Sequence, residues 1–71
     1  MMYKELFRQR LKEARQMAEL TQQEAADDLE ISRENISKYE TGNLEPSIEM
    51  IGRLAALYHV DISWLFGTDL L

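Results

Sequence analysis

The chain has 71 residues, no cysteine and a formal net charge of −5 at pH 7. This length allows one domain with a small core, which buries about 60% of the surface of the unfolded chain and leaves no room for a buried cofactor, and the lack of cysteine excludes a disulfide framework or a thiolate zinc site. No apolar run reaches the roughly 18 residues of a membrane span and the N-terminus lacks the apolar segment of a signal peptide, so we expect a soluble cytoplasmic protein without membrane contact.

The first predicted helix runs from Tyr3 to about Ala18. Its apolar residues recur at helical spacing, and arginine and lysine occupy the other faces. The apolar repeat consists of Phe7, Leu11, Ala14 and Ala18. One face of this helix is therefore expected to pack on the core.

The segment 20–42 predicts two short helices joined by a tight turn. Thr21 and Glu24 form a capping box that starts a helix over about Gln22–Leu29. Ser32 caps the next helix, expected over about Arg33–Glu40 and ended by Gly42. The apolar seam that two crossing helices would share consists of Ala26, Leu29, Ile31, Ile36 and Tyr39. The segment about 21–40 is thus a helix-turn-helix candidate.

Two more helices are predicted after a loop over residues 42–46. Ser47 caps a fourth helix, and its apolar stripe consists of Ile48, Ile51, Leu54, Ala55 and Tyr58. Asp61 caps a short fifth helix, Ile62–Phe66, which Gly67 closes. We expect its Trp64, Leu65 and Phe66 to plug the core, with pairing of two subunits as an alternative use of the same apolar surface. The fold class is all-α: one compact five-helix domain over residues 1–71.

The third helix presents a polar face suited to reading DNA bases. At 100° per residue an arc of roughly 140° holds Arg33, Glu34, Ser37, Lys38 and Thr41, while the apolar residues lie opposite. Arginine bonds guanine bidentately and glutamate accepts from cytosine; lysine reaches guanine or a phosphate, and serine allows close approach. Asn35, at the edge of the arc, would pair with adenine. We therefore assign base reading to this face of the recognition helix, about residues 33–40.

Phosphate contacts are expected beside this face. Gln22 lies at the start of the second helix, where free backbone N–H groups favour an anion. Thr21, Thr41 and Asn43 complete the predicted set of phosphate contacts. Together these residues are expected to contact DNA phosphates.

A net charge of −5 argues against DNA binding, but the charges are unevenly distributed along the chain. Residues 1–19 hold five bases against three acids, residues 20–40 two against six, and residues 41–71 one against four. Since salt screens charges beyond about 8 Å, the local charge decides the field at a groove. We expect a dipolar molecule with a modestly basic DNA-facing side and weak non-specific affinity.

The segment 20–42 resembles the Cro/CI-type (XRE) helix-turn-helix family of bacterial and phage repressors. The likeness extends to Arg15, to Pro46–Ser47 and to the sequence of residues 60–67, VDISWLFG. The resemblance implies a five-helix, lambda-repressor-like domain with its third helix in the major groove. It also implies a homodimer on a palindromic operator in double-stranded DNA, in a bacterial nucleoid or a phage-infected host.

The resemblance carries particular roles onto this sequence. The family's phosphate-binding glutamine matches Gln22, and its base-reading positions match Arg33, Glu34, Asn35 and Lys38. A structural ion pair between the first and third helices maps to Arg15 and Glu40. Two departures weaken the expected DNA affinity more than the fold: Glu30 replaces the usual turn glycine, and the loop before Pro46 carries Asn43 and Glu45 instead of bases.

Other functions are less well supported by the sequence. An enzyme is not expected, because the chain lacks a nucleophile–base pair, a defined acid pair and a phosphate-cradling glycine loop. His59 stands without metal-ligand neighbours, and the acids Asp27, Asp28 and Glu30 are best read as a solvated face. Two alternatives stay open: an antitoxin-like module with a protein partner, and the N-terminal DNA-reading head of a longer regulator.

Overall fold

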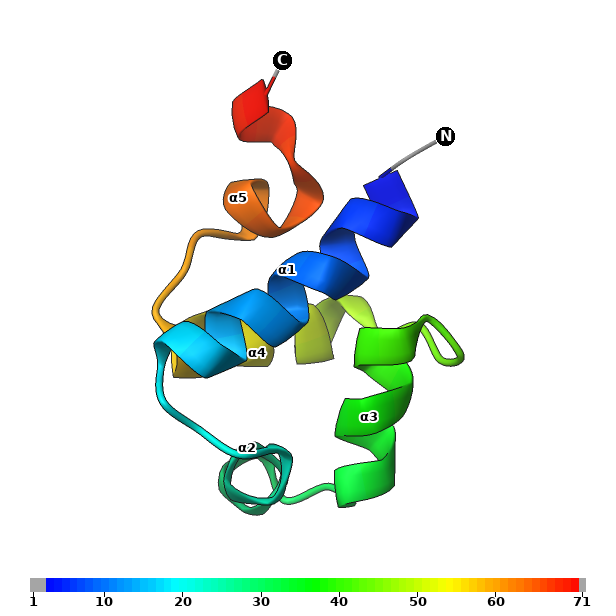
Figure 1. The fold of residues 1–71 in the computed structure, drawn as a ribbon, viewed down its shortest axis with the longest axis vertical. Coiled ribbons are helices and arrows are strands. Elements are labelled where there is room, and N and C mark those ends of the chain that lie inside the picture. The colour runs from blue at the N-terminus through cyan, green and yellow to red at the C-terminus, as the bar shows by residue number, and fades with distance from the viewer. Residues whose placement is uncertain (1–2, 71) are drawn as a thin grey trace.

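The computed structural model describes residues 3–70, and helices joined by short loops form its secondary structure (Figure 1). They are α1 (Tyr3–Met17), α2 (Gln22–Leu29), α3 (Arg33–Thr41), α4 (Ile48–Tyr58), α5 (Ile62–Phe66) and a 3-10 turn, η1 (Thr68–Leu70). The all-α, five-helix prediction is confirmed, and only η1 was not expected. The predicted domain spans residues 1–71, of which 1, 2 and 71 lie outside the described part.

Side-chain caps start three of the helices where the sequence predicted them. The Thr21 hydroxyl accepts from the Glu24 amide at 3.0 Å while the Glu24 carboxylate accepts from the Thr21 amide at 2.9 Å. Ser32 and Ser47 accept in the same way from amides three residues later. Asp61 occupies the corresponding position before α5, but its side chain makes no capping hydrogen bond. The prediction that Asp61 caps α5 was right about the position and wrong about the hydrogen bond. The short α5 therefore depends on its packing.

Four helices end in the same way, in a left-handed residue followed by a backbone hydrogen bond that spans the turn. The left-handed residues are Glu19, Glu30, Gly42 and His59. The next amide in each case donates to a carbonyl five residues back, as in the bond of Ile31 to Ala26 at 3.0 Å. Only Gly42 was predicted as an end of this kind from the usual glycine. After the other three comes an apolar residue that packs against the core: Leu20, Ile31 and Val60.

Helix α1 is the centre of the fold and contacts both halves of the molecule. In Figure 1 it crosses the middle of the domain, with α5 and η1 on one side and α2 and α3 on the other. The largest fully buried side chains come from four elements: Leu11, Ile36, Leu54 and Leu65. Buried residues of α2 belong to the same cluster, so the core joins all five helices.

One residue of the predicted α4 stripe does not reach the core. Ile48 is 89% exposed, whereas Leu54, Ala55 and Tyr58 are buried as expected. Ile48 is the first residue of the helix and lies about 70° from the centre of the stripe on a helical wheel. The side chain of Ile48 therefore points to solvent, although Met50 and Ile51 of the same turn pack against the core.

Candidate nucleic-acid interface

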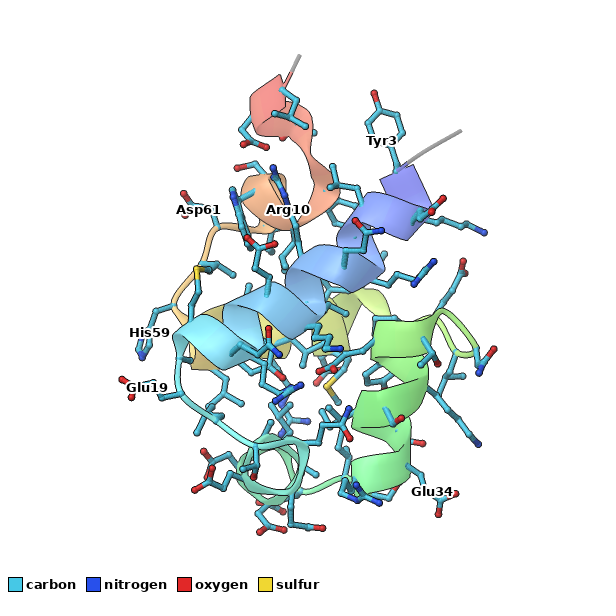
Figure 2. The ribbon with its side chains drawn as sticks, viewed as in Figure 1. Tyr3, Arg10, Glu19, Glu34, His59 and Asp61 are labelled. Carbon is cyan, nitrogen blue, oxygen red and sulfur yellow. The ribbon has the colours of Figure 1, made fainter. Side chains whose placement is uncertain are left out.

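Helix α3 divides into a buried and an exposed side, as its sequence pattern requires. Ile36 and Tyr39 are buried in the core, at 1% and 8% exposure. The exposed side carries Arg33, Glu34, Lys38 and Thr41, with Ser37 half-buried between them. Asn35 is also half-buried, at the edge of this side. Figure 2 shows Glu34 pointing away from the body of the molecule at the start of α3.

The other end of α3 is anchored to α1 by a buried ion pair. Arg15 donates from Nε and Nη2 to the two carboxylate oxygens of Glu40, at 2.7 and 3.1 Å. A third donor of the same guanidinium, Nη1, binds the Leu20 carbonyl at 2.8 Å in the connection to α2. Arg15 thereby ties α3 and the start of the motif to one point on α1.

Gln22 joins this buried cluster from the N-terminus of α2. Its Nε2 donates to the Glu40 carboxylate at 3.2 Å. An amide nitrogen carries two hydrogens, so one donor remains for a further acceptor. The capping box uses the amide of Glu24, which leaves the earlier amides of α2, those of Gln22 and Gln23, without intrahelical partners. The half-buried Gln22 side chain thus lies at a helix end suited to an anion, held by the carboxylate of α3.

The remaining predicted phosphate contacts flank α2 and α3. Thr21 is exposed and engaged in the capping box. The Thr41 hydroxyl donates to the Lys38 carbonyl at 3.3 Å, and the backbone amide of Asn43 donates to the same carbonyl at 2.9 Å. Because that carbonyl occupies the Asn43 amide, only the exposed side chain of Asn43 is available to a ligand.

The loop after α3 borders a groove of about 530 Å³ against the start of α1. Apolar side chains form most of its walls, among them Tyr3, Phe7, Tyr39 and Leu44. An exposed ion pair between Lys4 and Glu45, 2.7 Å long, joins the loop to α1. The Glu45 carboxylate also favours the charged form of Lys4 by hydrogen bonding and so raises its pKa. The loop is therefore connected to α1 by a contact that lies in solvent.

Three of the five basic residues of α1 are paired with carboxylates elsewhere in the molecule. Lys4, Arg10 and Arg15 are paired with carboxylates of other elements: Glu45, Asp69 and Glu40. Arg10 lies on the α5 side, far from Glu34 in Figure 2. Arg8, by contrast, lies beside Gly42 at the end of α3 and adds positive charge near that helix. The modestly basic DNA-facing side therefore stays a prediction. The positive charge on the exposed side of α3 comes from Arg33 and Lys38.

A buried tyrosine closes the cluster from α4. Tyr58 is 4% exposed, and burial raises its pKa to about 12, with the Glu40 carboxylate acting in the same direction and Arg15 opposing it. The hydrogen bond to Glu40 also raises the pKa of Arg15. This interior therefore favours the charged form of Arg15 and the neutral form of Tyr58.

The turn between α2 and α3 contains a contact that the sequence did not reveal. Glu30 is left-handed (φ 57°), as its place in the motif suggested. Arg53, from α4, donates from Nη2 to the Leu29 carbonyl at 2.8 Å, directly before this turn. The sequence signal was that Arg53 is the single base of residues 41–71, against four acids.

Comparisons with known proteins agree with this geometry. A family model described as helix-turn-helix matches residues 11–65, most of the chain. The chain is 45% identical over 60 residues to the HTH-type transcriptional regulator ImmR of Bacillus subtilis (strain 168), covering 84% of this chain and 47% of that protein. The chain thus spans about half the length of this curated relative. Within residues 3–70 no helix is long and apolar enough to cross a membrane.

Proposed function

The chain belongs to the helix-turn-helix family of the Cro/CI (XRE) type, and from this premise we propose that it is a sequence-specific DNA-binding domain of a transcriptional regulator. The regulator acts as a repressor and binds an inverted-repeat operator as a homodimer. Helix α3 enters the major groove, and the N-terminus of α2 contacts the backbone. DNA binding needs no catalytic group, and the domain is not an enzyme.

One observation supports this proposal above the others. The exposed side of α3 holds Arg33, Glu34 and Lys38, and the hydrogen bond between Gln22 and Glu40 ties the N-terminus of α2 to that helix. Base-reading and phosphate-binding donors are therefore parts of one rigid surface. DNA recognition uses both kinds of donor, because phosphate contacts position the protein on the duplex and contacts with base edges specify the sequence.

The dimer is proposed from the family resemblance, which implies pairs of domains on palindromic operators. Two recognition helices about 34 Å apart would face half-sites centred about 10 bp apart, or a multiple of that spacing. Of the apolar residues of α5, Leu65 is fully buried and is unavailable to a second subunit. Ile62 keeps 46% of its surface exposed at the start of α5 and is the stronger candidate for a subunit contact.

Selection of random-core duplexes by the purified domain at low salt, followed by sequencing, tests the proposal. We expect enrichment of an inverted repeat with one fixed half-site spacing. Enrichment of a single half-site would keep the DNA reader and reject the dimer. A folded domain that enriches nothing would overturn the proposal in favour of a module that depends on a protein partner.

Arg33→Ala tests the base-reading face. We expect a loss of about 1–3 kcal/mol in binding to the selected site and relaxed preference at one base pair. His59→Asp, in the exposed turn after α4, is the matched control because it lowers the net charge by the same unit, and Figure 2 shows His59 on the opposite side of the molecule from Glu34. An equal loss on all duplexes would reassign Arg33 to a phosphate.

Gln22→Ala tests the phosphate contact, with Gln23→Ala as its control. Gln23 is the same residue type one position later, but its amide donates to Asp27 at 2.9 Å. We expect Gln22→Ala to weaken every duplex by a similar factor and Gln23→Ala to change little. A shift in base preference for Gln22→Ala would contradict the assignment.

A further inference from the structure

Arg53 makes a long-range contact at a sensitive point of the motif. Its Nη2 atom donates to the Leu29 carbonyl at 2.8 Å, in a partly buried hydrogen bond between residues 24 positions apart. Leu29 is the last residue of α2. The bond therefore joins α4 to the point where the chain leaves α2 and turns toward α3.

The end of α2 lacks a favourable charge of its own. The last turn of this helix has no basic residue, and it carries Asp27 and Asp28 next to Glu30. Carboxylates are unfavourable at the negative end of the helix dipole, where a cation is stabilising. The guanidinium of Arg53 supplies from α4 the positive charge that α2 does not contain.

Backbone amides after the helix bind the carbonyls of Ala26 and Asp27, whereas a side chain binds that of Leu29. The amides of Glu30 and Ile31 donate to Ala26 and Asp27. The Leu29 carbonyl lies beyond their reach and receives the side chain of Arg53. Since Glu30 holds a left-handed conformation that a non-glycine residue adopts at a cost, an external bond beside it helps to keep the turn in one geometry.

We propose that Arg53 is a positioning residue for DNA recognition: it holds the end of α2 on α4 so that Gln22 and the exposed side of α3 keep the relative placement that the operator requires. Arg53 acts through Leu29 and touches no DNA itself. The expected effect on affinity for DNA rests on the proposed function. The expected effect on hydrogen exchange at the turn does not depend on that function.

The variant Arg53→Ala tests the proposal, with Arg10→Ala as the matched control. Both changes remove one arginine and one bond to a backbone carbonyl, but Arg10 binds the Trp64 carbonyl in α5. The probes are a single half-site of the duplex recovered by the selection, so that the subunit contact proposed at α5 plays no part, and a scrambled duplex of the same length. Measurements are made at a temperature where both variants are fully folded by circular dichroism.

We expect Arg53→Ala to lower affinity for the half-site duplex by about tenfold, with little change on the scrambled duplex. Arg10→Ala should leave both affinities unchanged, and Arg53→Lys, which retains the charge and a donor, should recover part of the loss. The slope of log K against log salt should stay that of the wild type. A slope smaller by about one would show a direct phosphate contact and overturn the positioning role. Equal losses of affinity in Arg53→Ala and Arg10→Ala would show that the effect is a general loss of stability and would overturn the positioning role.

Hydrogen exchange without DNA separates this inference from the proposed function. In Arg53→Ala we expect faster exchange of the Glu30 and Ile31 amides and unchanged exchange in α5. If the wild type selects no duplex but this pattern appears, the proposed function fails while the anchoring by Arg53 stands. If exchange at the turn is unchanged, the positioning role is rejected whatever the outcome with DNA.

Discussion

Two arginines of α1 hold opposite sides of the molecule, and they do so in different ways. Arg15 is 8% exposed and gives three donors to the motif side, two of them to the buried carboxylate of Glu40. Arg10 lies over the Trp64 ring, 4.6 Å from its centroid, and binds the Trp64 carbonyl and Asp69 at the partly exposed α5 side. A buried charge depends on its one partner, whereas water substitutes in part for a lost partner at the surface.

The difference separates a rigid functional side from a more adaptable one. On the motif side the contacts of Arg15, Glu40 and Gln22 converge, so a change in one affects the others. On the α5 side, Phe7 of α1 stacks on Phe66 of α5, in addition to the contacts of Arg10. The two ring centroids are 4.9 Å apart. The same helix therefore anchors the recognition surface by directional bonds and α5 mainly by packing.

The largest effect is expected from Arg15→Ala. It leaves the Glu40 carboxylate buried without its cation, and breaking a buried pair in this way costs about 3–5 kcal/mol. Chemical denaturation should show this loss in the free energy of unfolding. Arg15→Lys, which retains the charge, should lose less. An unchanged thermal midpoint for Arg15→Ala would show that the pair adds nothing to stability.

The next effect is confined to alkaline pH and concerns Tyr58. Its pKa is raised from 10.0 to about 12 in the folded protein, chiefly by burial, so the unfolded state releases the proton first. The corresponding stability is present below pH 10 and is lost as the pH rises toward 12. Tyr58→Phe should flatten this decline in a series of unfolding midpoints, while Tyr3→Phe, at an exposed position, should not. An identical decline in all three proteins would contradict the assignment to Tyr58.

A smaller and more local effect is expected for Arg10→Ala. Loss of a charged hydrogen bond and of the contact with Trp64 should cost about 1–2 kcal/mol. Hydrogen exchange should rise in α5 and η1 but not in α2 or α3. Equal loosening of both sides would show that the two halves unfold as one unit and would remove the contrast drawn between the two arginines.

The smallest effect, and one of opposite sign, is expected for Glu30→Gly. Glycine adopts the left-handed conformation without the cost of a side chain, so stability should rise by about 1 kcal/mol. Gly42→Ala is the complementary variant and should destabilise, because φ is +83° and a Cβ would lie 2.9 Å from the Arg8 side chain. A fall in stability for Glu30→Gly would show that the Glu30 side chain itself holds the turn.

Much of the fold could be predicted because its signals are local. The caps at Thr21, Ser32 and Ser47 involve an amide three residues away, and the helix bounds agree with them within one residue. Of the five left-handed helix ends, Gly42 and Gly67 were predicted and Glu30 was suggested by its place in the motif. Glu19 and His59 were missed because glycine was taken as the usual marker. The apolar residue after each of them was the signal available.

The site was predictable in its members but not in its connections. The exposed side of α3 follows from the helical period, which places Ile36 and Tyr39 opposite Arg33 and Lys38. The period could not show that Gln22 would share the Glu40 carboxylate with Arg15. It also could not show where the charge of α1 would be neutralised.

The sequence by itself determined the five helices, three of their N-caps and the polar side of α3, because each depends on residues within about one turn of one another. Only the tertiary structure decided that Arg10 meets Asp69, that Arg53 meets Leu29 and that Ile48 stays exposed. The first two contacts join residues 59 and 24 positions apart. Their partners, like the exposure of Ile48, are set by how the helices cross in the packed core and not by the period within any one helix.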